Sequence, residues 1–96
     1  MLLLPFAGYT VLNLGDLCGF SEIVLDVNDC RTVFPSLDFV EEENTSDWPK
    51  GCYVLGGEYL INFHNSLERP PRKFFNRHPS GNSHHQAAPI CKTKST

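Results

Sequence analysis

The clearest hydrophobic pattern lies in the middle of the chain, where two β-prone runs flank a Gly-Gly pair. The first run covers residues 52–55 and the second covers residues 58–63. A two-residue glycine connection between such runs predicts a β-hairpin. In the second run, Tyr59, Ile61 and Phe63 alternate with other residues, so they are expected to share one face of a strand.

A second pattern, with apolar residues three or four positions apart, precedes this hairpin. This spacing predicts a short helix with one apolar stripe against a sheet. Asn28 or Asp29 is expected to cap the helix N-terminus, and Pro35 is expected to end or kink it. The stripe consists of Cys30, Val33, Phe34 and Leu37.

The remaining elements are short. We predict strands at 22–27, 39–40 and 74–77, a turn at 48–51, and loops at 41–47, 64–73 and 79–83. The fold class expected from these elements is α+β: a small disulfide-stabilised domain with one short helix packed on an antiparallel sheet.

The chain is the size of one domain, with 96 residues. Residues 1–14 are interpreted as a lead-in, either a strand or a processing remnant, because they are apolar but make a poor signal peptide. Pro5 breaks this run, which is also too short to span a bilayer, so the chain is not expected to cross a membrane itself. The domain is placed at 15–92 and a tail at 93–96.

Composition narrows the possible functions. Hydrophobic residues make up 41% of the chain, which is enough for a globule. The formal net charge is −3 and the sequence pI is about 5.7. A general nucleic-acid binder would carry a basic face, so nucleic acid is not an expected partner.

Four cysteines without a C-x-x-C pair favour two disulfides over a zinc site, which usually brings two ligands within a few residues of each other. They are Cys18, Cys30, Cys52 and Cys91. Each disulfide is expected to contribute about 2–4 kcal/mol to stability. Such cross-links predict an oxidising compartment, either extracellular or an organelle lumen, with the thylakoid lumen as an alternative.

Three segments stand out as specific motifs: W-P-K-G-C-Y at 48–53, F-F-N-R-H-P-S-G at 74–81 and A-A-P-I-C-K at 87–92. In these motifs the chain resembles a small four-cysteine module that recurs in secreted or luminal proteins of dinoflagellates and other marine microalgae. The resemblance covers roughly residues 18–92 and implies a disulfide module of uncharacterised function. Its order of one helix followed by strands is loosely similar to PAN/apple-type adhesive domains, an analogy of fold only.

In that module the glycine turn passes almost directly to the F-F-N strand, whereas residues 59–73 intervene here. Either 58–63 or 74–77 is therefore expected to pair with the strand before the turn. Four cysteines allow three pairings. We favour Cys30–Cys52, which would join the helix to the first hairpin strand, together with Cys18–Cys91, which would join the two ends of the domain.

Candidate ligand chemistry is sparse. His78, His84 and His85 could hold zinc or copper, but adjacent histidines on an extended loop are expected to point to opposite sides. The simpler interpretation is a polar surface loop in which His78 bonds to backbone. Asn44 begins an N-x-S/T sequon and could carry a glycan in a secreted eukaryotic protein.

No catalytic set is apparent in the sequence, so we predict that the chain is not an enzyme and needs no cofactor. An even cysteine count argues against a free nucleophilic thiol. The preferred function is a protein-interaction or structural module, for example an accessory subunit of a larger membrane-associated, luminal assembly. Carbohydrate binding through exposed aromatics and metal binding through 78–85 are the alternatives. The candidate binding residues are Trp48, Tyr53, Tyr59, Asn76 and His78.

Overall fold

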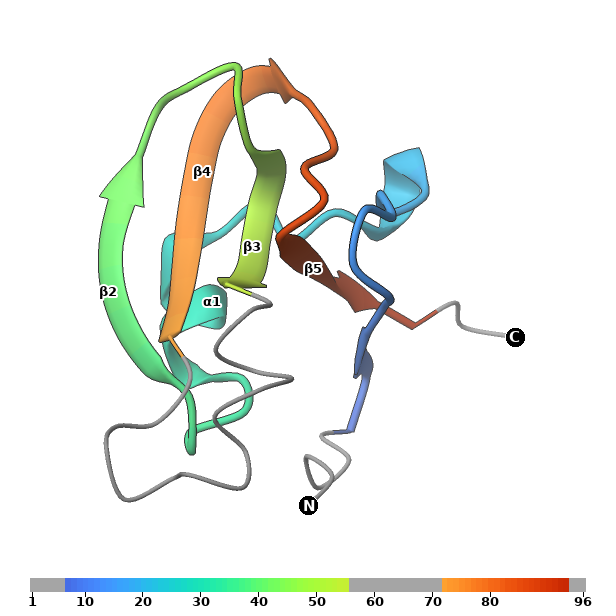
Figure 1. Cartoon of the computed structure of the whole chain (residues 1–96). Helices are drawn as coiled ribbons and strands as arrows, with labels where there is room; N and C mark the ends of the chain where they lie inside the picture. The colour runs from blue at the N-terminus through green and yellow to red at the C-terminus, as the bar shows by residue number, and fades with distance from the viewer. Residues whose placement is uncertain (1–6, 56–71, 94–96) are drawn as a thin grey trace.

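The computed structural model describes residues 7–55 and 72–93, and within them a five-stranded sheet is covered on one face by a single short α-helix (Figure 1). The elements in chain order are β1 (Tyr9–Val11), the 3-10 turn η1 (Phe20–Glu22), α1 (Val27–Thr32), β2 (Asp38–Glu43), β3 (Pro49–Leu55), β4 (Arg72–Gly81) and β5 (Ala87–Lys92). The fold is thus α+β as expected, with far more strand than helix.

The sheet is mixed, with strand order β1-β5-β3-β4-β2. Three neighbouring pairs are antiparallel, but β2 runs parallel to β4. The expectation of a wholly antiparallel sheet is therefore wrong in this one pair. The pairing of β2 with β4 also moves residues 41–43 from the expected loop into a strand. Because β2 is an edge strand, three consecutive glutamates can form backbone pairs and still reach water.

Strand β3 pairs with β5 on one side and with β4 on the other, where Cys52 lies opposite Phe75 and Tyr53 opposite Phe74. Of the two segments expected to pair with this strand, 58–63 and 74–77, it is 74–77 that pairs with β3. Segment 58–63 lies outside the described residues, as does Tyr59. Strand β4 extends into the segment 79–83, which was expected to be a loop, and ends at Gly81.

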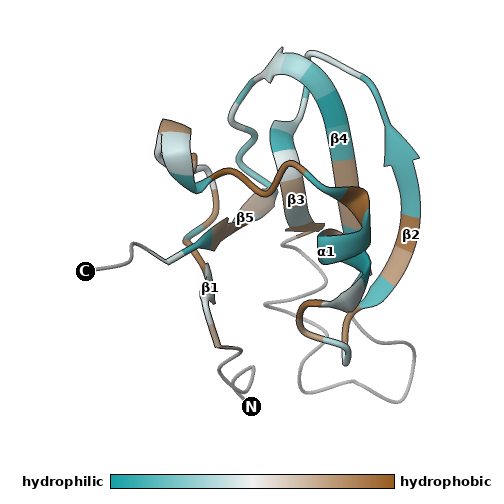
Figure 2. Cartoon of the chain, turned by 180° about the vertical axis from the view of Figure 1, so that it is seen from behind, coloured by the Kyte–Doolittle hydropathy of each residue, from teal (hydrophilic) through white to brown (hydrophobic). Residues whose placement is uncertain are grey.

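Helix α1 begins two or three residues earlier than expected. Asp26 is the N-cap, because its Oδ1 accepts a hydrogen bond of 2.8 Å from the Asn28 backbone N–H. The helix ends at Thr32, so Pro35 lies beyond it. Figure 2 shows α1 in front of β3, β4 and β2, the three strands that it contacts.

The core lies between this helix and the sheet. All four members of the predicted apolar stripe are buried, although only Cys30 lies inside the helix. Cys52 and Val54 of β3 face the same layer, as does Phe75 of β4, and all three belong to the core cluster. The intervening Tyr53 and Phe74 therefore lie on the opposite face of the sheet.

Residues before the predicted domain boundary are part of the fold. Strand β1 pairs with β5 at one edge of the sheet, and Tyr9, Val11 and Leu14 pack against the core. The strand expected at 22–27 does not form. Ile23 makes only an isolated bridge to Cys91, and the segment is instead bounded by η1 and by the Asp26 cap of α1.

One charged side chain lies fully inside the core layer. Lys73 is opposite Val54 in the β4–β3 pair, and its Nζ donates hydrogen bonds to the backbone oxygens of Arg31, at 3.1 Å, and Val33. The ammonium thus satisfies carbonyl groups at the C-terminal end of α1, where a cation is favourable. Burial lowers the pKa of Lys73 to about 8.

This lowered pKa predicts that stability rises with pH from 8 to 9.5. The unfolded chain has an ordinary lysine pKa, so it binds more protons than the folded chain across this window. We expect the free energy of unfolding to increase by about 1–2 kcal/mol, since one pKa unit is worth about 1.4 kcal/mol. Urea unfolding at several pH values measures the slope. Lys73→Met should remove the rise, and an unchanged slope in that variant would contradict the assignment.

Candidate functional site

Both disulfides have the pairing favoured above. Cys30–Cys52 joins α1 to β3 over a sequence separation of 22, and Cys18–Cys91 spans a separation of 73. No cysteine is left free. These two intramolecular cross-links indicate an oxidising compartment. They also leave no thiol for nucleophilic or redox chemistry.

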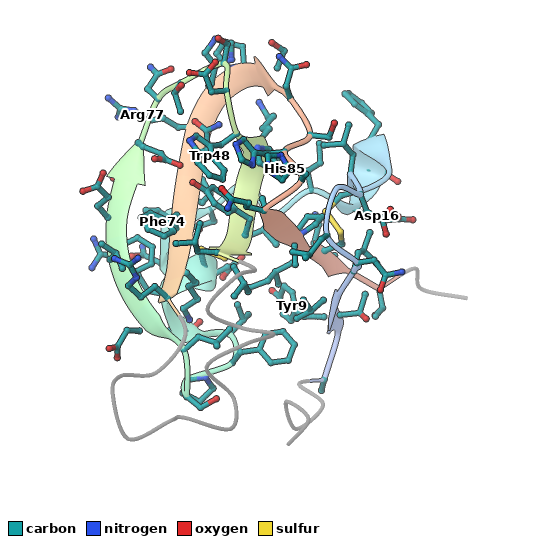
Figure 3. All side chains as sticks on the ribbon, viewed as in Figure 1. Tyr9, Asp16, Trp48, Phe74, Arg77 and His85 are labelled. Atoms are coloured by element: carbon teal, nitrogen blue, oxygen red, sulfur yellow. A yellow bond between two sulfur atoms is a disulfide. The ribbon has the colours of Figure 1, made fainter. Side chains whose placement is uncertain are left out.

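Five parallel rings form a row on the sheet face opposite α1. We call this set the aromatic row. Its ring centroids are 5.4 Å apart between Phe74 and Tyr53, 5.4 Å between Tyr53 and Trp48, 3.8 Å between Trp48 and His84, and 4.7 Å between His84 and His85. Figure 3 shows Phe74, Trp48 and His85 along this face. Stacked rings contribute stability beyond the area that they bury.

The aromatic row changes the interpretation of two candidate residues. Tyr53 is buried, and Trp48 is stacked between Tyr53 and His84, so its indole faces are already occupied. A sugar ring needs a free aromatic face, and within the described residues Trp48 does not offer one. The expectation that His84 and His85 point to opposite sides is wrong, because their rings stack with an interplanar angle of 15°.

Asn76 is a structural residue rather than a ligand-binding one. Its side chain is fully buried. Its Oδ1 accepts hydrogen bonds from the backbone N–H groups of Thr45, at 3.1 Å, and His78, at 3.2 Å. Its Nδ2 donates to the backbone oxygens of Thr45 and Trp48, both at 2.9 Å. Because the amide is fully used, Asn76 fixes the β2–β3 connection and has no capacity left for a ligand.

His78 also bonds to backbone. Its Nδ1 accepts hydrogen bonds from the N–H groups of Ser80, at 3.1 Å, and Gly81, at 3.0 Å. The ring therefore supports the end of β4, as the simpler interpretation of the histidine loop expected. Across residues 7–55 and 72–93, no group of three or more His, Cys, Asp or Glu side chains is arranged to hold a metal ion.

Glu43 is tied to the aromatic row because its Oε1 accepts a hydrogen bond from the Tyr53 hydroxyl. Burial raises the pKa of Glu43 against the lowering effect of this hydrogen bond, and nearby Glu41 raises it further. The pKa of Tyr53 is also raised, mainly by burial and then by the bond to Glu43. This hydrogen bond keeps the tyrosine protonated and connects β2 to β3. The pair does not have the arrangement of a nucleophile and its general base.

A shallow polar hollow of about 200 Å³ lies next to this pair at the end of β2. It is lined by Glu42, Glu43, Asn44 and Arg77. Two of these lining residues form an ion pair, with 3.5 Å between the Arg77 Nη1 and the Glu42 Oε2, and both side chains are substantially exposed. The hollow contains no buried polar group without a hydrogen-bond partner. It therefore offers an open space lined by polar and charged side chains.

The most exposed large apolar side chains lie in and beside η1, a site that the sequence analysis did not identify. Phe20 is 94% exposed, Leu25 66% and Leu17 54%. The segment is held to β5 by the Cys18–Cys91 disulfide and by the Ile23 bridge to Cys91. Figure 1 shows η1 projecting from the body of the domain. The sequence feature that could have indicated this site is a large aromatic residue, Phe20, that lies among turn residues two positions after Cys18.

No protein-family model matches the chain, and comparison with curated proteins and with solved structures found no match. The resemblance to the microalgal module and its PAN/apple-type analogy therefore stay predictions. In the described part of the chain, no helix has the length and apolarity that crossing a membrane requires.

Proposed function

We propose that this chain is a non-catalytic, disulfide-stabilised module that binds a protein partner in an extracellular or luminal compartment. The observation that carries the proposal is Phe20, a large aromatic side chain 94% exposed on a projecting turn. A single exposed apolar side chain is ordinary, but several large ones on one segment are typical of a protein-interaction surface. Leu17 and Leu25 extend the apolar character of the same segment. We call residues 17–25 the Phe20 segment.

The disulfide makes this segment suitable for binding. Cys18 lies two residues before η1 begins, and its bond to Cys91 ties the segment to the sheet. A turn that is already fixed loses less conformational entropy when it binds than a flexible one would. An aromatic side chain that fills a pocket on a partner is the usual kind of binding hot spot.

The charges beside the segment indicate the chemistry of the partner. Asp16 and Asp26 flank it and are exposed, while their side chains cap local backbone N–H groups. The surface is therefore apolar at the centre and acidic at its margins. We infer a partner protein with an apolar pocket bordered by basic side chains, either a free ligand protein or a larger assembly in which the chain is an accessory subunit.

Phe20→Asp is expected to abolish this association without unfolding the domain. An exposed side chain contributes little to folding, so the free energy of unfolding should change by no more than about 0.5 kcal/mol. In native extract of the producing organism, the wild-type chain should migrate in a species much larger than 10.8 kDa. The Phe20→Asp chain should migrate as the free species.

The matched control is Val40→Asp, which adds the same charge to an exposed apolar position on β2. It should leave the large species intact. Migration of the wild-type chain at 10.8 kDa, or equal loss of the large species in both variants, would contradict the proposal. Chemical cross-linking of the wild-type species would then identify the partner.

A further inference from the structure

The sequon in the β2–β3 connection is the strongest feature that protein binding leaves unexplained. Asn44 begins the tripeptide Asn44-Thr45-Ser46 directly after β2 and is exposed. Its side chain has no hydrogen bond within residues 7–55 and 72–93. We propose that Asn44 is a modification site that carries an N-linked oligosaccharide. A sequon alone arises often by chance, so the argument rests on how the folded chain presents this one.

The structure leaves Asn44 free while fixing its neighbour. Thr45 is bound through both its backbone N–H and its backbone oxygen to the buried side chain of Asn76. Its Oγ1 accepts a hydrogen bond of 3.1 Å from the Asp47 N–H. Ser46, the hydroxyl residue of the sequon, is exposed. The folded domain can therefore hold a glycan at Asn44 without breaking any hydrogen bond of this connection.

Space for the first sugar is present beside the amide. Asn44 itself lines the hollow of about 200 Å³ together with Glu42, Glu43 and Arg77. Carboxylate and guanidinium groups can bond to sugar hydroxyls, so a sugar linked to the Asn44 Nδ2 would meet polar partners rather than apolar surface. The hollow thus suits the base of a glycan attached at this position.

The position also agrees with the rest of the surface. Figure 1 shows the β2–β3 connection on the side of the sheet away from η1. An oligosaccharide at Asn44 would cover the outer end of β2 and leave the Phe20 segment open to a partner. The two disulfides indicate an oxidising compartment, and N-glycans are attached to proteins that enter such compartments in eukaryotes.

The attachment is a transfer from an oligosaccharide joined through diphosphate to a lipid. The Asn44 Nδ2 gives up one proton and bonds to the anomeric carbon of the first sugar. The bond between that carbon and the phosphate oxygen breaks, and the lipid diphosphate leaves with the bonding electrons and takes up the proton. No oxidant or reductant is needed.

The test is the intact mass of the full chain secreted from eukaryotic cells, measured before and after the glycan-releasing amidase PNGase F. We expect the mass to fall on treatment and aspartate to replace asparagine at position 44. Ser46→Ala should abolish the added mass, whereas Ser83→Ala, at an exposed serine outside the sequon, should retain it. A secreted, disulfide-bonded chain whose mass PNGase F does not change would overturn the proposal, as would retention of the glycan in Ser46→Ala.

Discussion

Replacing Cys18 and Cys91 together by alanine is expected to lower the free energy of unfolding by about 4 kcal/mol. The disulfide closes a sequence separation of 73 residues, and a cross-link of this length removes much of the freedom of the unfolded chain. A domain of this size is marginally stable without such help. We therefore expect the variant to be largely unfolded near body temperature and to fold only in the cold or with osmolytes.

Urea unfolding of the double variant and of the wild-type chain measures this loss. The matched comparison is Cys30→Ala with Cys52→Ala, where the cross-link spans only 22 residues and accounts for about 3 kcal/mol. Both of those cysteines are buried in the core, so their replacement also removes packing. A loss below about 1 kcal/mol for the Cys18 and Cys91 pair would contradict the entropic account.

The same disulfide links stability to the proposed function. It holds the segment that carries Phe20 against β5, so its loss should release that segment even at temperatures where the sheet persists. Phe20→Asp acts only on the binding surface and leaves both cross-links in place. Comparing the two variants therefore distinguishes a loss of binding caused by unfolding from a loss of binding caused by removal of the Phe20 contact.

The sequence predicted which residues are buried better than it predicted their backbone. The spacing of the apolar stripe correctly placed Val33, Phe34 and Leu37 in the core, yet none of them is helical. Phe34 precedes Pro35, and the residue before a proline is disfavoured in the right-handed helical region. It adopts a φ of 49° instead, which turns the chain toward β2.

The acidic strand could not be predicted from local pattern. Residues 41–43 have the composition of a solvated loop, and only the parallel pairing with β4 makes them a strand. Long-range pairing of this kind depends on tertiary contacts that override propensity. A strand was expected at 39–40, but neither its extension to Glu43 nor its parallel pairing with β4 was predicted. This one unpredicted pairing accounts for the error in sheet type.

The candidate site shows the same limit. The sequence analysis proposed Trp48 and Tyr53 for binding and the two adjacent histidines for metal binding, but it could not place their rings side by side. Their stacking depends on strand register and on the course of the chain into β5. Phe20 was missed because exposure is a tertiary property, and phenylalanine is more often part of the core. The sequon at Asn44 could be recognised in the sequence, whereas the hollow beside it could be found only in the structure.

Asn76→Leu is expected to destabilise the domain by about 3 kcal/mol, the second large effect that we predict. The substitution keeps a similar volume but leaves four backbone groups without their partner: the N–H groups of Thr45 and His78, and the carbonyls of Thr45 and Trp48. Buried polar groups without a hydrogen bond cost about 1–3 kcal/mol each, and those near the surface regain water. Urea unfolding measures the loss.

Asn76→Asp is the sharper variant because it preserves shape and changes only hydrogen-bond character. A carboxylate can still accept from Thr45 and His78, but it places a negative oxygen against the carbonyls of Thr45 and Trp48. The pKa of the introduced carboxyl should therefore rise in the folded chain, since only the protonated form can donate. Stability should be higher at pH 4 than at pH 7, relative to wild type, because the folded chain then binds more protons than the unfolded chain. Equal stability of Asn76→Asp and wild type at pH 7 would show that this amide does not hold the β2–β3 connection.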